Sequence, residues 1–116
     1  AGDNAIVIAL AAYAALGPAA EALCHSDLHR NNLLQQGGRC WLLDWEYAHV
    51  GDPYWDLAGW AWSAQLPPPL SDALLSDYLQ REPLAPERRR LQLLLRLYEF
   101  ICRLWSAVAA QPPVAP

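Results

Sequence analysis

The sequence lacks methionine and contains only three cysteines, Cys24, Cys40 and Cys102, among its 116 residues. An odd number of cysteines without a C-x-x-C pair argues against a disulfide framework and favours a reducing compartment. We therefore expect free thiols and a cytoplasmic protein. A net charge of −4 gives no general attraction for nucleic acid or for an anionic membrane, and we expect neither as a partner.

Long apolar runs are also missing. The most apolar N-terminal run, "AIVIALAAYAALG", is only about a dozen residues, whereas a membrane-spanning helix needs about 20. No basic segment precedes it, as a signal peptide would require. The spacing of its large side chains, and the break at Gly17 and Pro18, predict a helix over residues 5–16 that is packed on nearly all sides. With 54% hydrophobic residues, the chain can form one small domain with a core.

A β-hairpin is predicted by two short apolar runs joined at Gly37 and Gly38, in "NLLQQGGRCWLLDW". Glycine readily adopts the positive φ that a tight two-residue turn needs. Because paired antiparallel strands run in opposite directions, the start of one lies beside the end of the other. We therefore expect Asn32 and Asp44 at the same edge, which the loop carrying Asp27 also reaches.

Three helices are predicted after the hairpin. Asp52, followed by a proline, has the character of an N-cap, and its helix should end at "LPPP", residues 66–69. A second helix is expected over 71–80 and a third over about 86–110, where apolar residues recur at helical spacing. The basic run at 88–90 is expected on a solvated face. Together these elements predict an α+β fold that is mostly helical.

Three polar side chains suggest chemistry: Asp27, Asn32 five residues later, and Asp44 after the hairpin. The arrangement H-x-D-L-x-x-x-N, followed by an aspartate at the end of the next strand, is what magnesium-dependent phosphoryl transfer requires. An alcohol nucleophile needs a carboxylate that orients it and takes its proton, a role that fits Asp27. Mg²⁺ prefers hard oxygen ligands, which Asn32 and Asp44 can provide.

The stretches "HSDLHRNNLL" and "LLDWEYAHVGDPYWDLA" resemble motifs of the aminoglycoside phosphotransferase and choline kinase superfamily, which has a protein-kinase-like fold. The resemblance covers Leu23 to about Ala58. It implies a kinase that uses ATP and Mg²⁺ to phosphorylate a small-molecule alcohol, so that nucleotide and alcohol are the partners. The roles that it implies are a catalytic base at Asp27, Mg²⁺ ligands at Asn32 and Asp44, and support of the catalytic loop by His25 and Asp56.

The sequence "DWEY" at 44–47 resembles the choline, ethanolamine and thiamine kinase branch more than the drug-resistance enzymes. A cationic substrate would suit this branch, because aromatic faces attract quaternary ammonium groups and a carboxylate adds complementary charge. The candidate substrate-binding residues are Trp45, Glu46, Tyr47, Glu99 and Trp105, with Trp55, Trp60, Trp62 and Tyr98 as further aromatic candidates. The acceptor itself stays open among choline, ethanolamine, thiamine and aminoglycoside types.

The sequence departs from this superfamily at its start. Such kinases have an N-terminal lobe with a lysine-bearing strand and a glycine-rich loop that covers the phosphates, and neither feature is found here. We therefore expect residues 1–116 to form the C-terminal lobe, with the catalytic loop and hairpin packed on helices. The N-terminal nucleotide-binding lobe would be missing from this chain, which alone should be inactive.

Two alternatives compete with the kinase interpretation. A truncated or pseudokinase-like module would bind a partner without catalysis; the missing lobe favours it, and the intact Asp27, Asn32 and Asp44 argue against it. A zinc site could instead use Asp27 with Cys24, His25 and His29, because histidines four residues apart meet on one face of a helix. The flanking residues look extended, however, and zinc leaves Asn32 and Asp44 unexplained.

Overall fold

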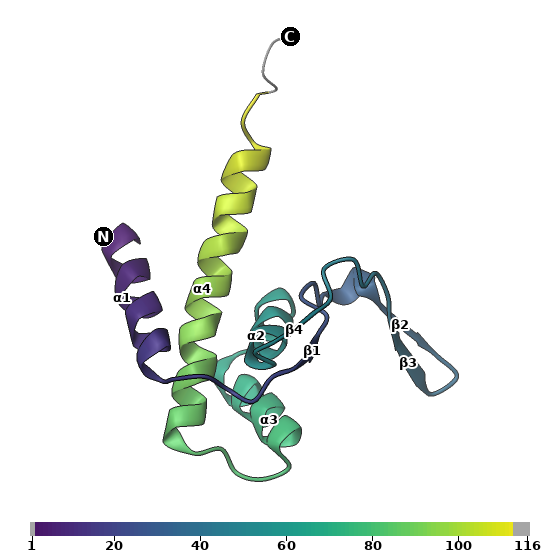
Figure 1. Cartoon of the computed structure of the whole chain (residues 1–116). Helices are drawn as coiled ribbons and strands as arrows, with labels where there is room; N and C mark the ends of the chain where they lie inside the picture. Colours follow the sequence, from purple (N-terminus) through teal and green to yellow (C-terminus); the bar gives the residue numbers. More distant parts are fainter. Residues whose placement is uncertain (1, 113–116) are drawn as a thin grey trace.

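The computed structural model describes residues 2–112 of the chain. Helices make up most of it, as Figure 1 shows, which confirms the mostly helical α+β fold. A short 3-10 turn, Arg30–Asn32, lies between the first two strands. The helices and strands are, in chain order, α1 (Gly2–Ala15), β1 (Ala22–Cys24), β2 (Leu33–Gln36), β3 (Arg39–Leu42), β4 (His49–Gly51), α2 (Tyr54–Ser63), α3 (Pro68–Leu79) and α4 (Ala85–Ala109).

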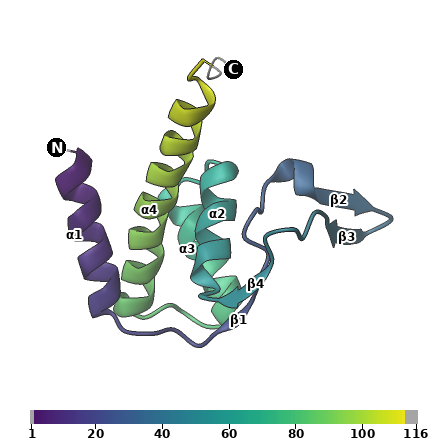
Figure 2. The same cartoon turned by 45° about the horizontal axis from the view of Figure 1, so that its top comes forward.

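Helix α4 lies at the centre of the fold, with α1 on one side and α2 and α3 on the other (Figure 2). Its leucines recur at helical spacing, so they present one stripe to α2 and α3 and a neighbouring stripe to α1. Burial of each leucine contributes roughly 1.5–3 kcal/mol, which makes this stripe the main source of cohesion. The core consists of Ala9, Tyr54, Ala58, Leu75, Leu91, Leu93, Leu94 and Leu97.

Helix α1 is more exposed than its sequence suggests. Ala9 is buried, but Val7 and Ile8 expose 64% and 67% of their surface, so the expectation of a helix packed on nearly all sides is wrong. The helix packs chiefly on α4, and a run of alanine and aliphatic residues has too little polar contrast to reveal which face is covered. Within the described residues, no helix combines the length and apolar character needed to cross a bilayer.

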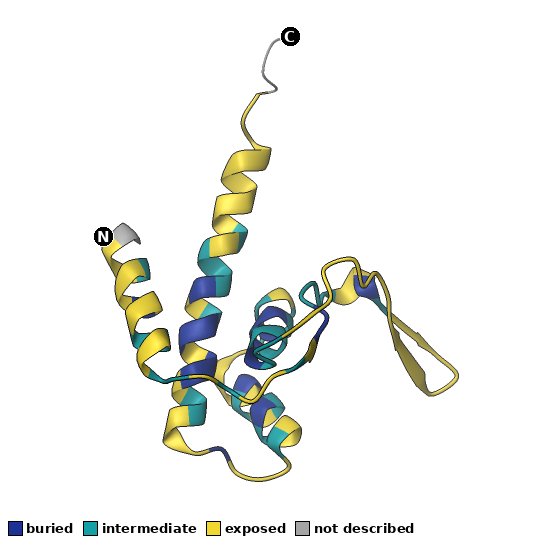
Figure 3. Ribbon diagram, viewed as in Figure 1, coloured by how far each residue is buried: buried dark blue, intermediate teal, exposed yellow. Residues whose placement is uncertain are grey.

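The hairpin forms where the sequence predicts it. Strands β2 and β3 pair antiparallel with Leu33 opposite Leu42, and Gly37 and Gly38 turn the chain with φ of 57° and 75°. Figure 3 shows that the hairpin projects away from the helices and is largely exposed, with every residue of β3 at the surface. The hairpin therefore does not pack on the helices as expected. Its register is set by the turn rather than by a helical partner.

The proline-rich segment begins a helix as well as ending one. Helix α2 ends at Ser63, and α3 starts at Pro68 rather than at Ser71. Proline is well tolerated in the first turn, because the N–H that it lacks would have no intrahelical partner there. At the start of α2 the N-cap is Pro53, one residue later than expected, and Asp52 Oδ1 accepts the backbone N–H of Tyr54 at 2.9 Å from just before the cap.

Arg90 is buried, so the expectation of a solvated basic face is wrong at this position, although Arg89 is exposed. The Arg90 guanidinium donates to Asp52 Oδ2 at 2.9 Å and to the backbone oxygen of Gly17 at 2.6 Å. It also lies 5.2 Å from the centre of the Tyr13 ring, and the Tyr13 hydroxyl donates to the same Asp52 carboxylate at 2.5 Å. This cluster joins the end of α1, the start of α2 and the first turns of α4.

Candidate active site

The loop that carries Asp27 is held by a carboxylate of α2. Asp56 Oδ2 accepts the backbone N–H of His25 at 2.7 Å, and Asp56 Oδ1 accepts that of Ser26 at 2.8 Å. Ser26 has a φ of 73°, a left-handed conformation that non-glycine residues rarely adopt and that costs about 1–3 kcal/mol. The two hydrogen bonds therefore hold the residue before Asp27 in a backbone geometry that it would not choose by itself.

His25 connects the same loop to the end of β3. Its ring is buried, and Nε2 lies 2.6 Å from the backbone oxygen of Leu43. A carbonyl oxygen only accepts, so Nε2 carries the proton, and Nδ1 can accept the backbone N–H of Asp27 at 3.1 Å. Trp45 packs edge-on against the ring at 4.7 Å. Neutral His25 in this tautomer thus sets the position of Asp27 relative to Asp44, which follows Leu43.

Asn32 and Asp44 come together at the base of the hairpin. The backbone N–H of Leu43 donates to the oxygen of Asn32 at 2.8 Å, which places Asp44 one residue beyond this pair. Asn32 is buried, and its Nδ2 donates to the backbone oxygen of Asp27 at 2.8 Å and to Asp27 Oδ2 at 3.2 Å. Its amide oxygen is left to serve as a ligand. Asp44 is exposed and has a φ of 58°. An amide oxygen and a carboxylate are suitable donors for Mg²⁺.

The residues that could form a zinc site make hydrogen bonds to other groups instead. The thiol of Cys24 donates to the backbone oxygen of Asp52 at 3.4 Å, and burial raises its pKa, which disfavours the thiolate that zinc requires. Both ring nitrogens of His25 are already engaged. In the part of the chain that the structure describes, no group of three or more His, Cys, Asp or Glu side chains could hold a metal ion. The geometry therefore does not support zinc.

Asp27 opens into a groove of about 760 Å³ between its own loop, the segment after β3, and helices α2 and α4. The groove brings Asp27 together with three of the expected substrate-binding residues, Glu46, Tyr47 and Trp105. These residues come from three separate segments of the sequence. Together they place two carboxylates and two aromatic side chains around one groove.

Trp45 and Glu99 do not line this groove. Trp45 donates its indole N–H to the backbone oxygen of Leu42 at 2.7 Å and supports the ring of His25 instead. Glu99 forms an ion pair with Arg103 at 2.6 Å. Successive residues of a helix are turned by about 100°, so Glu99 points away from the face that carries its neighbour Tyr98.

Ser26 and His49 line the groove, although neither was selected as a site residue from the sequence. Ser26 Oγ lies 2.9 Å from His49 Nδ1 on one wall, and Trp55 lies on another. Tyr98 lines the groove from α4 and packs closely on α2, because a Cβ at Gly59 would lie 3.0 Å from its ring. Burial raises the pKa of Tyr98 to about 12, so its hydroxyl stays a hydrogen-bond donor. Trp55 and Tyr98 were further aromatic candidates from the sequence, and both line the groove, whereas Trp60 and Trp62 do not.

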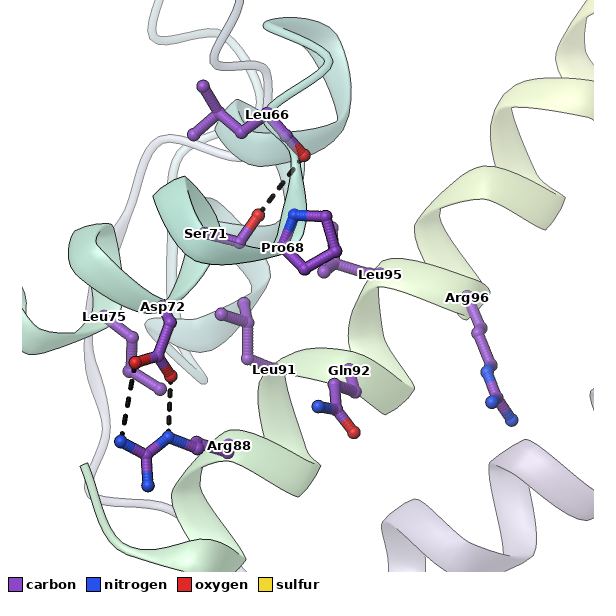
Figure 4. A pocket seen from close by; sticks show the side chains of 10 residues that line it. All are labelled: Leu66, Pro68, Ser71, Asp72, Leu75, Arg88, Leu91, Gln92, Leu95 and Arg96. Atoms are coloured by element: carbon purple, nitrogen blue, oxygen red, sulfur yellow. Dashed lines mark hydrogen bonds and ion pairs between the residues drawn. The ribbon is translucent and has the colours of Figure 1, made fainter.

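A second hollow, of about 370 Å³, lies between α3 and α4 (Figure 4). Arg88 donates from Nε to Asp72 Oδ1 at 2.7 Å across its rim, so Arg88 pairs with α3 rather than simply facing solvent. None of Asp27, Asn32 and Asp44 lines this hollow, which is therefore separate from the candidate site.

The family model described as "Phosphotransferase enzyme family" matches residues 3–94. Protein LicA of Haemophilus influenzae is 40% identical over 55 residues, which are 47% of this chain and 21% of that protein. A second LicA sequence from Haemophilus influenzae has the same identity over 55 residues and is covered to 16% of its length. The chain thus spans only a minor part of these relatives.

Solved structures show the same fold. A choline/ethanolamine kinase family protein from Mesorhizobium loti is similar over 100% of this chain and 41% of its own, with 28% identity and a TM-score of 0.81. The choline kinase LicA from Streptococcus pneumoniae is similar in fold over 97% of this chain and 41% of its own, with 24% identity and a TM-score of 0.68. The family model covers most of the chain, and the chain therefore belongs to the phosphotransferase enzyme family.

Proposed function

We propose that this chain is the C-terminal, catalytic and substrate-binding lobe of a kinase that transfers a phosphoryl group from ATP to the hydroxyl of a small cationic molecule. The observation that carries the proposal is the position of Asp27. Its carboxylate shares one groove with Glu46 and accepts a hydrogen bond from Asn32, one of the two candidate metal ligands. In this proposal an N-terminal lobe outside these residues binds the nucleotide, and the chain alone is inactive.

Asp27 would act as the base. Asn32 Nδ2 engages Asp27 Oδ2, while Oδ1 lies 3.6 Å from His29 Nε2, beyond a good hydrogen bond. Oδ1 is therefore the better placed atom to accept the hydrogen bond of an acceptor hydroxyl. It would orient the hydroxyl oxygen towards the phosphorus atom and take its proton as the new O–P bond forms.

Asn32 and Asp44 fit a role as Mg²⁺ ligands by the chemistry of their oxygen atoms and by their meeting at the hairpin base. Bound there, the ion would neutralise charge on the phosphate oxygens. A structure of LicA in complex with AMP, similar in fold with a TM-score of 0.67, supports nucleotide binding in this fold.

The acceptor would be held by charge and aromatic contact. Glu46 offers a carboxylate, and the face of Tyr47 can attract an ammonium group. The similarity to choline kinase structures favours choline or a related amino alcohol within the proposed class.

The test is a product assay with the full-length protein, ATP and Mg²⁺, in which ³¹P NMR follows choline, ethanolamine, thiamine and an aminoglycoside. We expect a new phosphate monoester with at least one acceptor, and its loss when the metal is chelated. Asp44→Asn should raise the Mg²⁺ concentration for half-maximal rate at least tenfold, whereas Asp77→Asn, at an exposed site on α3, should not. Saturable acceptor binding without any monoester would contradict the proposal and favour the non-catalytic module.

A further inference from the structure

The groove has two chemically different ends. Tyr98 packs on Gly59 of α2, and Asp56, one turn earlier on α2, holds the loop that carries Asp27, so the Tyr98 end lies near this loop. Trp105 lies seven residues further along α4, which is roughly 10 Å at 1.5 Å per residue. Between them, Ile101 and Cys102 line the same wall. The reacting hydroxyl of an acceptor would therefore lie at one end, with an apolar surface extending away from it.

The groove is also larger than a simple amino alcohol. Its volume is about 760 Å³. An acceptor that spans only a few bonds could not reach from Asp27 to Trp105, and the distal part of the groove would stay filled with water. Pockets of this volume are typical of drug-sized ligands.

Trp105 exposes 69% of its surface, and Figure 3 shows that the last turns of α4 extend beyond the helices that cover its first half. Exposed apolar side chains that border a polar site commonly mark a binding surface. Along the α4 wall beyond Tyr98, the described lining residues are Ile101, Cys102, Trp105 and Ser106, which offer little hydrogen bonding beyond a thiol and a hydroxyl. A polyhydroxylated amino sugar placed here would lose hydration without gaining partners, whereas an apolar group would gain contact area.

We infer that the acceptor carries an apolar group the size of a ring, several bonds from its reacting hydroxyl, which packs against Ile101 and Trp105. The inference rests on the proposed kinase function, because Asp27 defines the hydroxyl end. It makes Trp105 a residue that determines specificity for the distal part of the acceptor.

The experiment compares two acceptors with the same hydroxyethyl-ammonium head, (2-hydroxyethyl)trimethylammonium and benzyl(2-hydroxyethyl)dimethylammonium, in the full-length protein. We expect the KM of the benzyl compound to be at least tenfold lower, with kcat values within threefold. Trp105→Ala should bring the two KM values together. The control is Leu104→Ala, which also truncates an apolar side chain on α4. Leu104 is 52% exposed and does not line the groove, so this variant should preserve the tenfold difference. Equal KM values in the unmodified protein, or equal effects of the two substitutions, would overturn the inference.

A binding measurement separates this inference from the proposed reaction. Benzyltrimethylammonium and tetramethylammonium have no hydroxyl and cannot be phosphorylated, so calorimetric titration with them reports the groove alone. A tenfold preference for the benzyl compound that Trp105→Ala abolishes supports the apolar subsite even where no phosphoryl transfer is detected. Equal affinities, or a preference that survives Trp105→Ala, contradict the subsite even where transfer to choline is observed.

Discussion

Replacing Asp56 with alanine removes the acceptor of the two hydrogen bonds that hold the catalytic loop. Net contributions of hydrogen bonds to a charged acceptor are about 1.5–3 kcal/mol each, and Asp56 is half-buried, so the lower end applies. Loss of both bonds, from His25 and Ser26, corresponds to about 3 kcal/mol. Part of this loss of stability is offset, because Ser26 can then leave its left-handed conformation. We expect Asp56→Ala to lower the free energy of unfolding by about 2 kcal/mol.

The effect on activity should exceed the effect on stability. Once Ser26 relaxes, the neighbouring Asp27 carboxylate moves, and displacement of a catalytic group by about 1 Å can lower the rate by about 100-fold. Urea unfolding and kcat of the full-length protein measure the two effects. Asp77→Ala, at an exposed position on α3, is the matched control and should change the unfolding free energy by less than about 0.5 kcal/mol. A kcat for Asp56→Ala within threefold of the unmodified protein would refute the role assigned to these hydrogen bonds.

Two further substitutions test other parts of the structure. The hydrogen bonds from Arg81 lower the pKa of Glu87 from 4.5 to about 2, so the stability that they contribute is present above pH 4.5 and is lost as the pH falls through about 2. Urea unfolding between pH 7 and pH 2 should show this loss, and Glu87→Gln should remove it; an unchanged acid profile in Glu87→Gln would contradict the assignment. Arg90→Met should lower the unfolding free energy by about 3 kcal/mol, because it leaves the Asp52 carboxylate without its buried cation. Arg89→Met, at the exposed neighbouring position, should change it by less than about 0.5 kcal/mol, and equal losses in the two variants would show that the buried pair is not stabilising.

Features that depend on neighbouring residues could be predicted from the sequence. The hairpin turn follows from Gly37 and Gly38, which adopt the positive φ that other residues avoid. The extent of α4 follows from its repeating leucines and its proline-marked start. The antiparallel register then places Asn32 beside the end of the partner strand, where Asp44 is found.

Features that depend on contacts between distant segments could not be predicted in this way. The direction in which the hairpin projects depends on which part of the protein lies beside it. Its apolar residues, such as Trp41, do not reveal that the hairpin faces solvent. The burial of Arg90 depends on Asp52 and Tyr13, both more than 30 residues away. Glu99 illustrates a different limit. Glu99 and Tyr98 were both candidates for the substrate site, but the turn of about 100° between successive helical residues places them on different faces of α4, and only Tyr98 lines the groove.

The most direct test of the central claim is the kcat of Asp27→Asn in the full-length protein with saturating ATP, Mg²⁺ and acceptor. Asparagine keeps the shape of the side chain and its hydrogen bond to the loop but cannot take the proton of the hydroxyl. If Asp27 is the base, kcat should fall by a factor of about 10²–10⁴, with the dissociation constant for ATP unchanged within threefold. A kcat within tenfold of the unmodified protein would show that Asp27 is not the base, and would contradict the reaction proposed for this groove.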